Sequence, residues 1–219
     1  MGQLSYIVVS TPRSATGWAS QVLTAMGLQC GHETYYNLRQ RQHTNILTEG
    51  VWGDSSWLAV PFIKDLPTYT TVVHLVRNPW HTIASFVGLG WFDWQASMVG
   101  LEYRMFMEEH LIGRIPDDSP LAGEVRRAAH FWMTWHMMIE LYAKARSDLQ
   151  YVRCQAESPV AAESMYRAIT GKDADVGLVI AADRIDLTYN SRGYAKPDVW
   201  LRRLDPHVVE LANRYGYPG

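Results

Sequence analysis

The sequence has only two cysteines among its 219 residues, and it has no long apolar run. Two cysteines are too few for a disulfide scaffold and lack the paired spacing of a zinc site, so we expect Cys30 and Cys154 to be reduced and buried. The most apolar stretch, residues 86–101, contains Asp93 and is too short to span a bilayer. The sequence therefore predicts no structural disulfide, no bound metal and no membrane-spanning segment.

The N-terminus also lacks the features of a targeting segment. It has neither the basic segment nor the apolar core and cleavage site of a signal peptide. Gly2 follows Met1, but Tyr6 stands where an N-myristoylation motif requires Ser or Thr. We therefore expect a cytoplasmic protein that is not anchored to a membrane.

Neither sign of charge is in strong excess. Twenty Lys and Arg residues stand against 22 Asp and Glu residues, for a formal net charge of −2, so nothing indicates a global electrostatic footprint for nucleic acid. Only four of the basic residues are lysines, and arginine is the side chain whose planar fork suits phosphate and sulfate groups. Any polyanion site is therefore expected to be local and built on arginine.

The composition excludes a disordered chain. Apolar residues make up 47% and charged residues 19% of the sequence, which is the range of a folded globular protein. The length suits one domain, and no internal repeat, linker or low-complexity tract divides it. We therefore expect a single domain over residues 1–219, with its oligomeric state left open.

The hydrophobic pattern repeatedly passes from a strand through a short loop to a helix. Strands are expected at residues 4–10, 71–76 and 149–154, and helices at 16–26, from 79 onward, at 94–111, at 121–145 and at 159–170. Between the first two units we expect a connective region in which Asp54, Ser55 and Ser56 cap a short helix. This alternation predicts an α/β fold, with a parallel sheet flanked by helices in three layers.

The first strand-to-helix loop, residues 10–18, is a candidate phosphate site. Backbone N–H groups and the positive end of the helix dipole converge on an anion at such a loop. It is not a Walker A loop, because G-x-x-x-x-G-K-[ST] is absent. Gly171-Lys172 is followed by Asp173 and has Tyr166 where the first glycine belongs. Ordinary ATP chemistry therefore loses support.

Two segments resemble motifs of the sulfotransferases that use 3′-phosphoadenosine 5′-phosphosulfate (PAPS). In that family's 5′-phosphosulfate loop, a Lys or Arg is followed by Ser-Gly-Thr-Thr and often by Trp. The matching residues here are Arg13, Ser14, Ala15, Thr16, Gly17 and Trp18. The family's 3′-phosphate motif is an Arg followed eight residues later by Ser, and Arg77 and Ser85 resemble it at the second strand-to-helix loop. Both motifs come in the family's order.

The resemblance implies a nucleotide-kinase-like, P-loop-like sulfotransferase fold with PAPS as co-substrate and no metal. The acceptor would be a hydroxyl of a carbohydrate or another small molecule. By the same resemblance Arg13 would stabilise the leaving phosphate, Trp18 would stack on adenine, and Arg77 with Ser85 would hold the 3′-phosphate. Arg192, in a polar loop, weakly resembles the family's late basic loop over that phosphate.

One residue of the first motif departs from the family. Ala15 stands where the family commonly has Gly, and a positive φ there would cost about 1–2 kcal/mol for Ala. Alternatively, the loop geometry differs slightly and uses Gly17. For the arginines the alternative is a surface, capping or salt-bridging role, and for Ser14, Thr16 and Ser85 it is a helix cap.

Glu33 is the first choice for the base that takes the acceptor proton. It follows the first helix by a short segment, and some bacterial members of the family resemble this in placing a catalytic Glu there. The alternative is a solvated loop Glu. His32 is the second choice, and His81 and His136 are more distant options, whereas His74 falls inside an expected strand and is read as a core or sheet-face residue.

The acceptor side of the site has no family motif. We expect the helix over residues 125–145 and the loop over residues 91–94 to line it with aromatic rings, which stack on sugars as well as on phenols. Two other functions stay open. One is a nucleotide-kinase-like phosphotransferase, and the other is a non-catalytic module that keeps the nucleotide pocket for binding or interaction.

Overall fold

The described strands form one parallel sheet in the order β2-β3-β1-β4-β5. The computed structural model of the protein describes residues 4–38, 52–92, 99–113, 122–187 and 205–218. The strands are β1 (Tyr6–Val9), β2 (Gln29–His32), β3 (Trp52–Ser55), β4 (Thr71–Val76) and β5 (Gln150–Gln155). All four neighbouring pairs are parallel, so the carboxyl ends of the strands meet at the same edge of the sheet.

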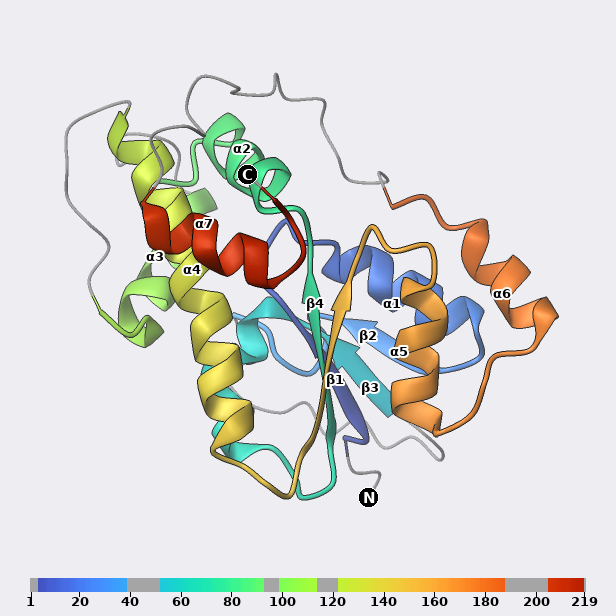
Figure 1. Cartoon of the computed structure of the whole chain (residues 1–219). Coiled ribbons are helices and arrows are strands. Elements are labelled where there is room, and N and C mark those ends of the chain that lie inside the picture. The colour runs from blue at the N-terminus through green and yellow to red at the C-terminus, as the bar shows by residue number, and fades with distance from the viewer. Residues whose placement is uncertain (1–3, 39–51, 93–98, 114–121, 188–204, 219) are drawn as a thin grey trace.

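Helices cover both faces of this sheet (Figure 1). Those on one face are α1 (Thr16–Ala25), α5 (Ala161–Thr170) and α6 (Val176–Asp183). Those on the other face are the 3₁₀ helix η1 (Trp57–Asp65), α2 (Pro79–Gly88), α4 (Ala122–Lys144) and α7 (Pro206–Arg214), with α3 (Val99–His110) beside them. The predicted α/β fold, with a parallel sheet flanked by helices, is therefore confirmed.

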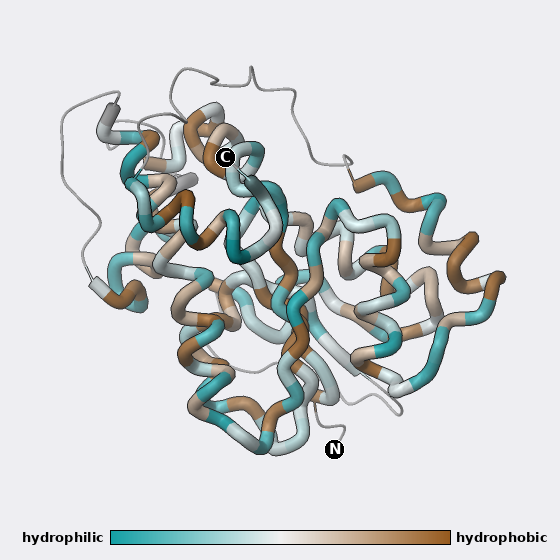
Figure 2. Tube along the Cα trace, in the orientation of Figure 1, coloured by the Kyte–Doolittle hydropathy of each residue, from teal (hydrophilic) through white to brown (hydrophobic). Residues whose placement is uncertain are grey.

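The alternating side chains of β4 show how the sheet feeds two cores. Val73 and Leu75 pack with α1 and α5, whereas Val72 and Val76 pack with α2 and α4. All four are completely buried, as expected for a central parallel strand with helices on both faces. Figure 2 shows apolar and polar residues alternating along α4, which is the pattern of a helix with one buried face.

Gly53 on β3 lets β1 and β3 approach closely. Tyr6 on β1 pairs with Gly53, and a Cβ at position 53 would collide with the Tyr6 ring. The Tyr6 hydroxyl then donates to the carbonyl oxygen of Gln29 on β2, at 2.9 Å. One aromatic side chain thus lies across three strands, and only glycine leaves room for it.

Several elements differ from the sequence predictions. The region between residues 27 and 70 is not merely connective, because it contains β2, β3 and the long helix η1. The helices α6 and α7 were not expected. The helix expected at 94–111 is described from Val99 on, and its first five residues lie outside the described ranges. The expected helix cap is present at Ser56, whose side chain accepts from the Leu58 N–H at 3.2 Å.

The cysteines also differ from the prediction in part. Both are free thiols, and Cys154 is buried, but Cys30 is only half-buried because it lies on the edge strand β2. Among the described residues, no helix combines the length and the apolar character needed to cross a bilayer.

Candidate functional site

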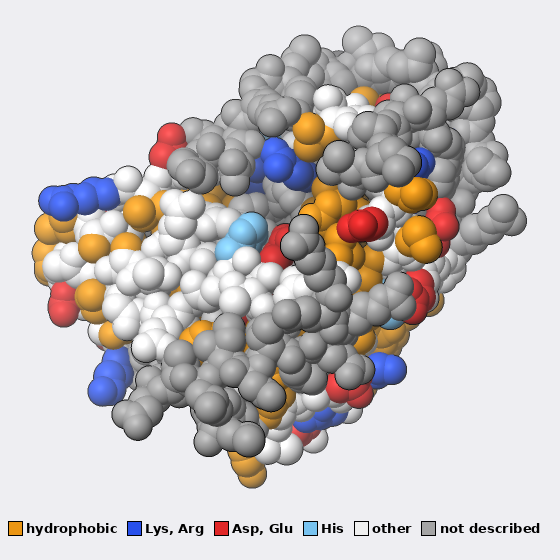
Figure 3. Space-filling view, turned by 180° about the vertical axis from the view of Figure 1, so that it is seen from behind, with side chains coloured by type: hydrophobic (Ala, Val, Ile, Leu, Met, Phe, Trp, Pro, Cys, Tyr) orange, Lys and Arg blue, Asp and Glu red, His pale blue; other side chains and the backbone are white. Residues whose placement is uncertain are grey.

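A pocket of about 210 Å³ opens where the carboxyl ends of the strands meet the loops that follow them. Its lining residues are Pro12, Arg13, Ala15, Thr16, Gly17, Trp18, His32, Glu33, Trp57, Arg77, Trp91, Tyr103 and Leu187. Figure 3 shows basic side chains next to a histidine and an acidic side chain at a hollow on this face of the molecule. The pocket thus brings together residues from the loops after β1, β2 and β4, together with residues of η1 and α3.

The loop between β1 and α1 turns sharply through two left-handed residues. Arg13 has φ 67° and Ala15 has φ 69°, so the positive φ considered for the alanine position is present there and Gly17 does not take it over. The Ser14 hydroxyl lies 2.6 Å from the Thr11 hydroxyl, which closes the loop on itself. Ser14, which was expected to bind the cofactor, is completely buried and does not line the pocket. Its side chain instead packs within the loop.

The first turn of α1 is open toward the pocket. Ala15 is the N-cap residue and, unlike Ser, Thr, Asp or Asn, it supplies no side-chain cap to the helix among the described residues. The first N–H groups of a helix need partners from outside the helix, and its dipole favours a negative charge there. This helix start can therefore receive an anion.

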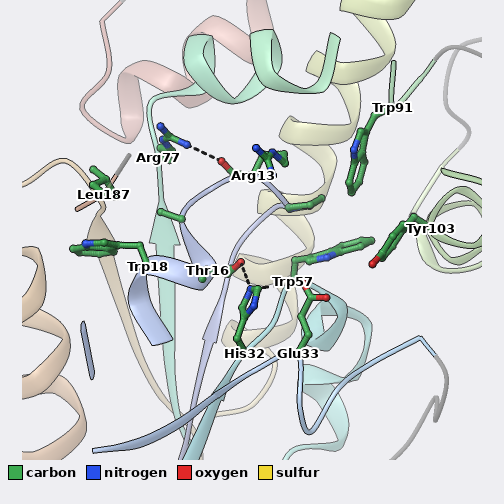
Figure 4. A pocket seen from close by; sticks show the side chains of 13 residues that line it. Arg13, Thr16, Trp18, His32, Glu33, Trp57, Arg77, Trp91, Tyr103 and Leu187 are labelled. Carbon is green, nitrogen blue, oxygen red and sulfur yellow. Dashed lines mark hydrogen bonds and ion pairs between the residues drawn. The ribbon is translucent and has the colours of Figure 1, made fainter. Parts of the chain in front are cut away.

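Two arginines converge on the same loop (Figure 4). Nε of Arg13 donates to the Ser85 hydroxyl at 3.1 Å, and Nη1 of Arg77 donates to the Arg13 carbonyl oxygen at 3.1 Å. The structure thus gathers Arg13, Arg77 and Ser85 at the carboxyl ends of β1 and β4. Nε of Arg77 is buried and makes no hydrogen bond to the described residues, but it faces the carboxylate of Glu157.

Glu157, which the sequence analysis did not single out, lies behind Arg77. Its Oε1 is 3.8 Å from Arg77 Nε and accepts the Asn78 N–H at 2.9 Å. The Tyr217 hydroxyl donates to Glu157 Oε2 at 2.5 Å and lies 3.1 Å from the Val76 carbonyl oxygen. Nothing in the spacing of the sequence indicates this cluster, because its members come from three distant segments.

Trp18 lies next to Leu187, at the side of the pocket away from Trp91 and Tyr103 (Figure 4). Its indole N–H donates to the Ile185 carbonyl oxygen at 3.2 Å, which fixes the ring against the segment after α6. The side chain is half-buried and lines the pocket, so part of the ring is free to contact a planar group.

Glu33 lies at the opposite end of the pocket, directly after β2. Its backbone has φ 51°, a left-handed conformation that a glutamate rarely adopts without support from its surroundings. Burial raises the pKa of its carboxyl to about 7, and the charge of Asp54 adds to this, while a hydrogen bond from the Trp57 side chain lowers it. Such a carboxyl can exchange a proton near neutral pH.

His32, the second candidate base, lies beside Glu33. Its Nε2 is 3.3 Å from the Thr16 hydroxyl and 3.8 Å from Glu33 Oε1. Burial lowers the pKa of His32, and the charge of Asp54 acts in the opposite direction. Thr16 also receives, on its carbonyl oxygen, the Ser55 hydroxyl at 2.8 Å, so the start of α1 is tied to the ends of β2 and β3.

Three aromatic rings form the wall around Glu33 (Figure 4). The centroids of Trp91 and Tyr103 are 5.6 Å apart with nearly parallel planes, and Trp57 lies 5.9 Å from Trp91 and 5.6 Å from Tyr103. The expectation that the helix over residues 125–145 lines this end was wrong, because none of the described residues of α4 borders the pocket. They pack behind it, where Trp135 meets Trp57 at 5.8 Å.

The two more distant histidine candidates do not reach the pocket. His81 is exposed on α2. His136 is completely buried, with its Nδ1 2.6 Å from Nε2 of His74, and His74 Nδ1 is 2.7 Å from the Tyr151 hydroxyl. Arg192 lies outside the described residues, as does Trp94 of the expected cleft loop.

Asp54 at the end of β3 is a further residue that the sequence analysis treated only as a helix cap. It is completely buried, and its carboxylate accepts the backbone N–H groups of Thr34, Tyr35 and Tyr36 at 3.0–3.1 Å. Within the described part of the chain, no cluster of His, Cys, Asp and Glu side chains is arranged to hold a metal ion.

The chain matches no model of a known protein family, and no curated protein has a significantly similar sequence. The chemistry of the pocket residues is therefore the basis for a functional assignment.

Proposed function

We propose that the protein is a sulfotransferase that moves a sulfuryl group from PAPS to a hydroxyl of a carbohydrate or another small molecule. One observation carries the proposal. A single pocket has two arginines and an open helix start at one end, and at the other end a carboxyl group with a pKa of about 7. Anion binding and proton removal are thus available on opposite sides of one reacting centre.

The reaction needs these two ends at the same time. The acceptor oxygen forms a bond to sulfur while the bond between sulfur and the bridging 5′-phosphate oxygen breaks, and that oxygen keeps the electron pair. Arg13 stabilises the charge that develops on the leaving phosphate. Glu33 accepts the proton of the acceptor hydroxyl, and a positioned base of this kind contributes roughly 10²–10⁴-fold to the rate.

The arginine end of the pocket fits a nucleotide with two separated phosphates. The loop after β1 is suited to the 5′-phosphosulfate, and Arg77 with Ser85, after β4, is suited to the 3′-phosphate. Arg77 supports this assignment because it lines the same pocket as Arg13 and donates to the backbone of the Arg13 loop. Trp18 is then placed to stack on adenine.

Isothermal titration calorimetry with 3′-phosphoadenosine 5′-phosphate tests the nucleotide assignment. We expect binding in the presence of EDTA, and weaker binding of ATP with Mg²⁺, since the loop lacks the Walker lysine. Tighter binding of ATP with Mg²⁺ would instead support the phosphotransferase. Adenosine 5′-phosphate, which lacks the 3′-phosphate, should bind more weakly, and equal affinity would contradict the roles of Arg77 and Ser85.

Arg77→Ala should weaken the binding of 3′-phosphoadenosine 5′-phosphate by roughly 1.5–3 kcal/mol, because a charge-assisted contact is lost from a partly desolvated site. Arg167→Ala is the matched control, since Arg167 is exposed and pairs with Asp173 away from the pocket. Catalysis is tested separately by incubating the protein with PAPS and a panel of phenols, alcohols and sugars. Nucleotide binding without turnover of any acceptor would favour the non-catalytic module.

A further inference from the structure

The segment that carries Glu33 is attached to the end of β3 through nearly every backbone donor it has. The Glu33 N–H donates to the Ser55 carbonyl oxygen at 3.2 Å. The next N–H groups donate to Asp54, that of Thr34 to Oδ1 and those of Tyr35 and Tyr36 to Oδ2. Four successive N–H groups are thus held by two neighbouring residues of one strand.

A carboxylate that accepts three backbone N–H groups fixes the turn that contains them. This turn gives Glu33 its φ of 51°, a conformation that costs about 1 kcal/mol or more for a residue other than glycine and needs support from its surroundings. The Ser56 hydroxyl adds a further tie by donating to the Tyr36 carbonyl oxygen at 3.0 Å. The end of β3 therefore sets the direction in which the Glu33 side chain leaves the backbone.

The neighbouring strand leaves space for the Asp54 carboxylate. Gly31 on β2 pairs with Asp54 in the parallel register, and a Cβ at position 31 would lie 2.8 Å from Asp54 Oδ1 and 2.7 Å from the Thr34 hydroxyl. A larger residue at position 31 would force the Asp54 carboxylate or the Thr34 side chain to shift. The segment Gly31-His32-Glu33 thus depends on the acid of the adjacent strand.

We propose that Asp54 is the positioning residue of this site, because its carboxylate holds the turn that presents Glu33 to the pocket and places a second negative charge beside it. The inference rests on the proposed function only in taking Glu33 as the base. Asp54 does not touch the reacting atoms, and it acts through the geometry and the proton affinity of Glu33.

The charge of Asp54 acts on Glu33 alongside several other groups. Nε2 of His32 on β2 lies 3.8 Å from Glu33 Oε1, and the Trp57 side chain on η1 hydrogen-bonds to the Glu33 carboxyl. The charge of Glu33 in turn raises the pKa of Tyr103 on α3. Arg13 lines the same pocket from the loop after β1. Burial is the largest cause of the raised pKa of Glu33, and the negative charge of Asp54 is the second.

The test is a carboxyl ¹³C NMR titration of Glu33 in the parent protein and in Asp54→Asn, with the signal assigned through Glu33→Gln. In the parent we expect a midpoint of about 7, and in Asp54→Asn a midpoint displaced toward the ordinary value of 4.5. Asp173→Asn is the matched control, because it removes an exposed carboxylate away from the pocket and should leave the midpoint unchanged. An unchanged midpoint in folded Asp54→Asn would overturn the proposal.

Because Asp54 is completely buried, its variant could unfold, and a measurement on the parent covers that outcome. The amides of Thr34, Tyr35 and Tyr36 should be protected from hydrogen exchange, and rapid exchange would overturn the anchoring role whatever the variant does. In folded Asp54→Asn, the acid limb of the pH–rate profile should move to lower pH and kcat should fall by about 10-fold or more, with nucleotide affinity retained.

The two proposals fail in different experiments. The NMR titration and the hydrogen exchange need neither PAPS nor an acceptor. If the nucleotide does not bind while Asp54→Asn still lowers the Glu33 midpoint, the sulfotransferase assignment fails and the positioning role stands. If the nucleotide binds and acceptors turn over while the midpoint does not move, the positioning role fails alone.

Discussion

Three pocket residues, Arg13, Ala15 and Glu33, adopt left-handed backbone conformations without being glycine. Each such residue stores roughly 1–2 kcal/mol of strain, which the surrounding hydrogen bonds must offset. Strain of this kind gathers where side chains have to point in directions that a relaxed loop does not offer. In this protein it occurs on both sides of the proposed reacting centre.

Replacing Ala15 with glycine should stabilise the protein. Glycine adopts φ 69° without strain, but it also gives the unfolded chain more freedom, so the free energy of unfolding should rise by a net amount of about 1 kcal/mol or less. Urea unfolding measures the difference. Ala162→Gly is the control, since position 162 lies in the first turn of α5 and has no positive φ to relieve, so glycine should destabilise there. Destabilisation by Ala15→Gly would contradict the strain argument.

The proposed role of Glu33 as proton acceptor predicts both a variant effect and a pH profile. Glu33→Gln should lower turnover by roughly 10²-fold or more with nucleotide affinity nearly unchanged, because the amide keeps the shape but accepts no proton. Since only the ionised carboxyl is a base, kcat/KM of the parent should rise with pH up to about 7 and then level off. Steady-state kinetics from pH 5 to 9 measures both.

Glu210→Gln, which alters an exposed carboxylate on α7, should leave the rate unchanged. If Glu33→Gln keeps turnover within a few-fold of the parent, Glu33 is not the base, and His32→Ala is then the variant to measure.

At the scale of elements, the strands that are easiest to predict from the sequence are those rich in apolar and β-branched residues. Thr71–Val76 was predicted with the boundaries that the structure has, because it is buried on both faces. β2 and β3, with the sequences QCGH and WGDS, were missed because neither has a hydrophobic run or a clear alternation. Their pairing comes from the tertiary structure. α6 was not predicted because it is apolar nearly all round and shows no helical periodicity. α7 could have been predicted, because Asp205-Pro206 is a typical helix start.

In the candidate site, too, some residues could be placed from the sequence and others only from the tertiary structure. Arg13 and Arg77 follow strands that the sequence reveals, and Ser85 lies on the helix after the second of them. Their meeting could therefore be predicted from the rule that parallel strands end at one edge. Tyr103 reaches the pocket only through the placement of α3, and Asp54 acts through its register beside Gly31. Neither contact follows from spacing along the chain.

The packing of β1 on β3 gives a prediction about these two strands. Gly53→Ala should lower the free energy of unfolding by about 1–3 kcal/mol, because the added methyl group overlaps the Tyr6 ring. In the Tyr6→Val background the same substitution should cost much less, so the pair should show a coupling energy in a double-mutant cycle. Equal costs of Gly53→Ala in both backgrounds would mean that the Tyr6 ring does not limit this position.

At the scale of the whole molecule, the buried pair of His74 and His136 links stability to pH. Burial lowers the pKa of His136 to about 3 and that of His74 well below its ordinary value. In the unfolded chain both take up protons near pH 6.5, so the stability present above that pH is lost progressively as pH falls toward 3. Each fully neutral histidine contributes roughly 1.4 kcal/mol per pH unit in this window.

Glu33 changes the free energy of unfolding in the opposite direction with pH. Its pKa is raised in the folded protein, so the stability that it contributes is lost as pH rises from 4.5 to about 7. The histidine effect is therefore measured in the Glu33→Gln background, by urea unfolding between pH 7 and pH 5. Stability should fall with decreasing pH, and to the same extent when the exposed His207 is replaced by Gln. A flat curve over this range would show that the pair is not held neutral.

The strand order has a consequence for how the chain reaches its folded state. β1 is the first strand in the sequence and lies in the middle of the sheet, with Tyr6 paired to Gly53 on one side and to Thr71 on the other. None of the described strand pairs is a hairpin, and each neighbour of β1 arrives only after a long intervening stretch of chain. Such contacts close slowly, because chain entropy is lost before pairing compensates for it. We therefore expect the loop that carries Arg13 to become ordered late in refolding, once β3 and β4 have paired with the two sides of β1.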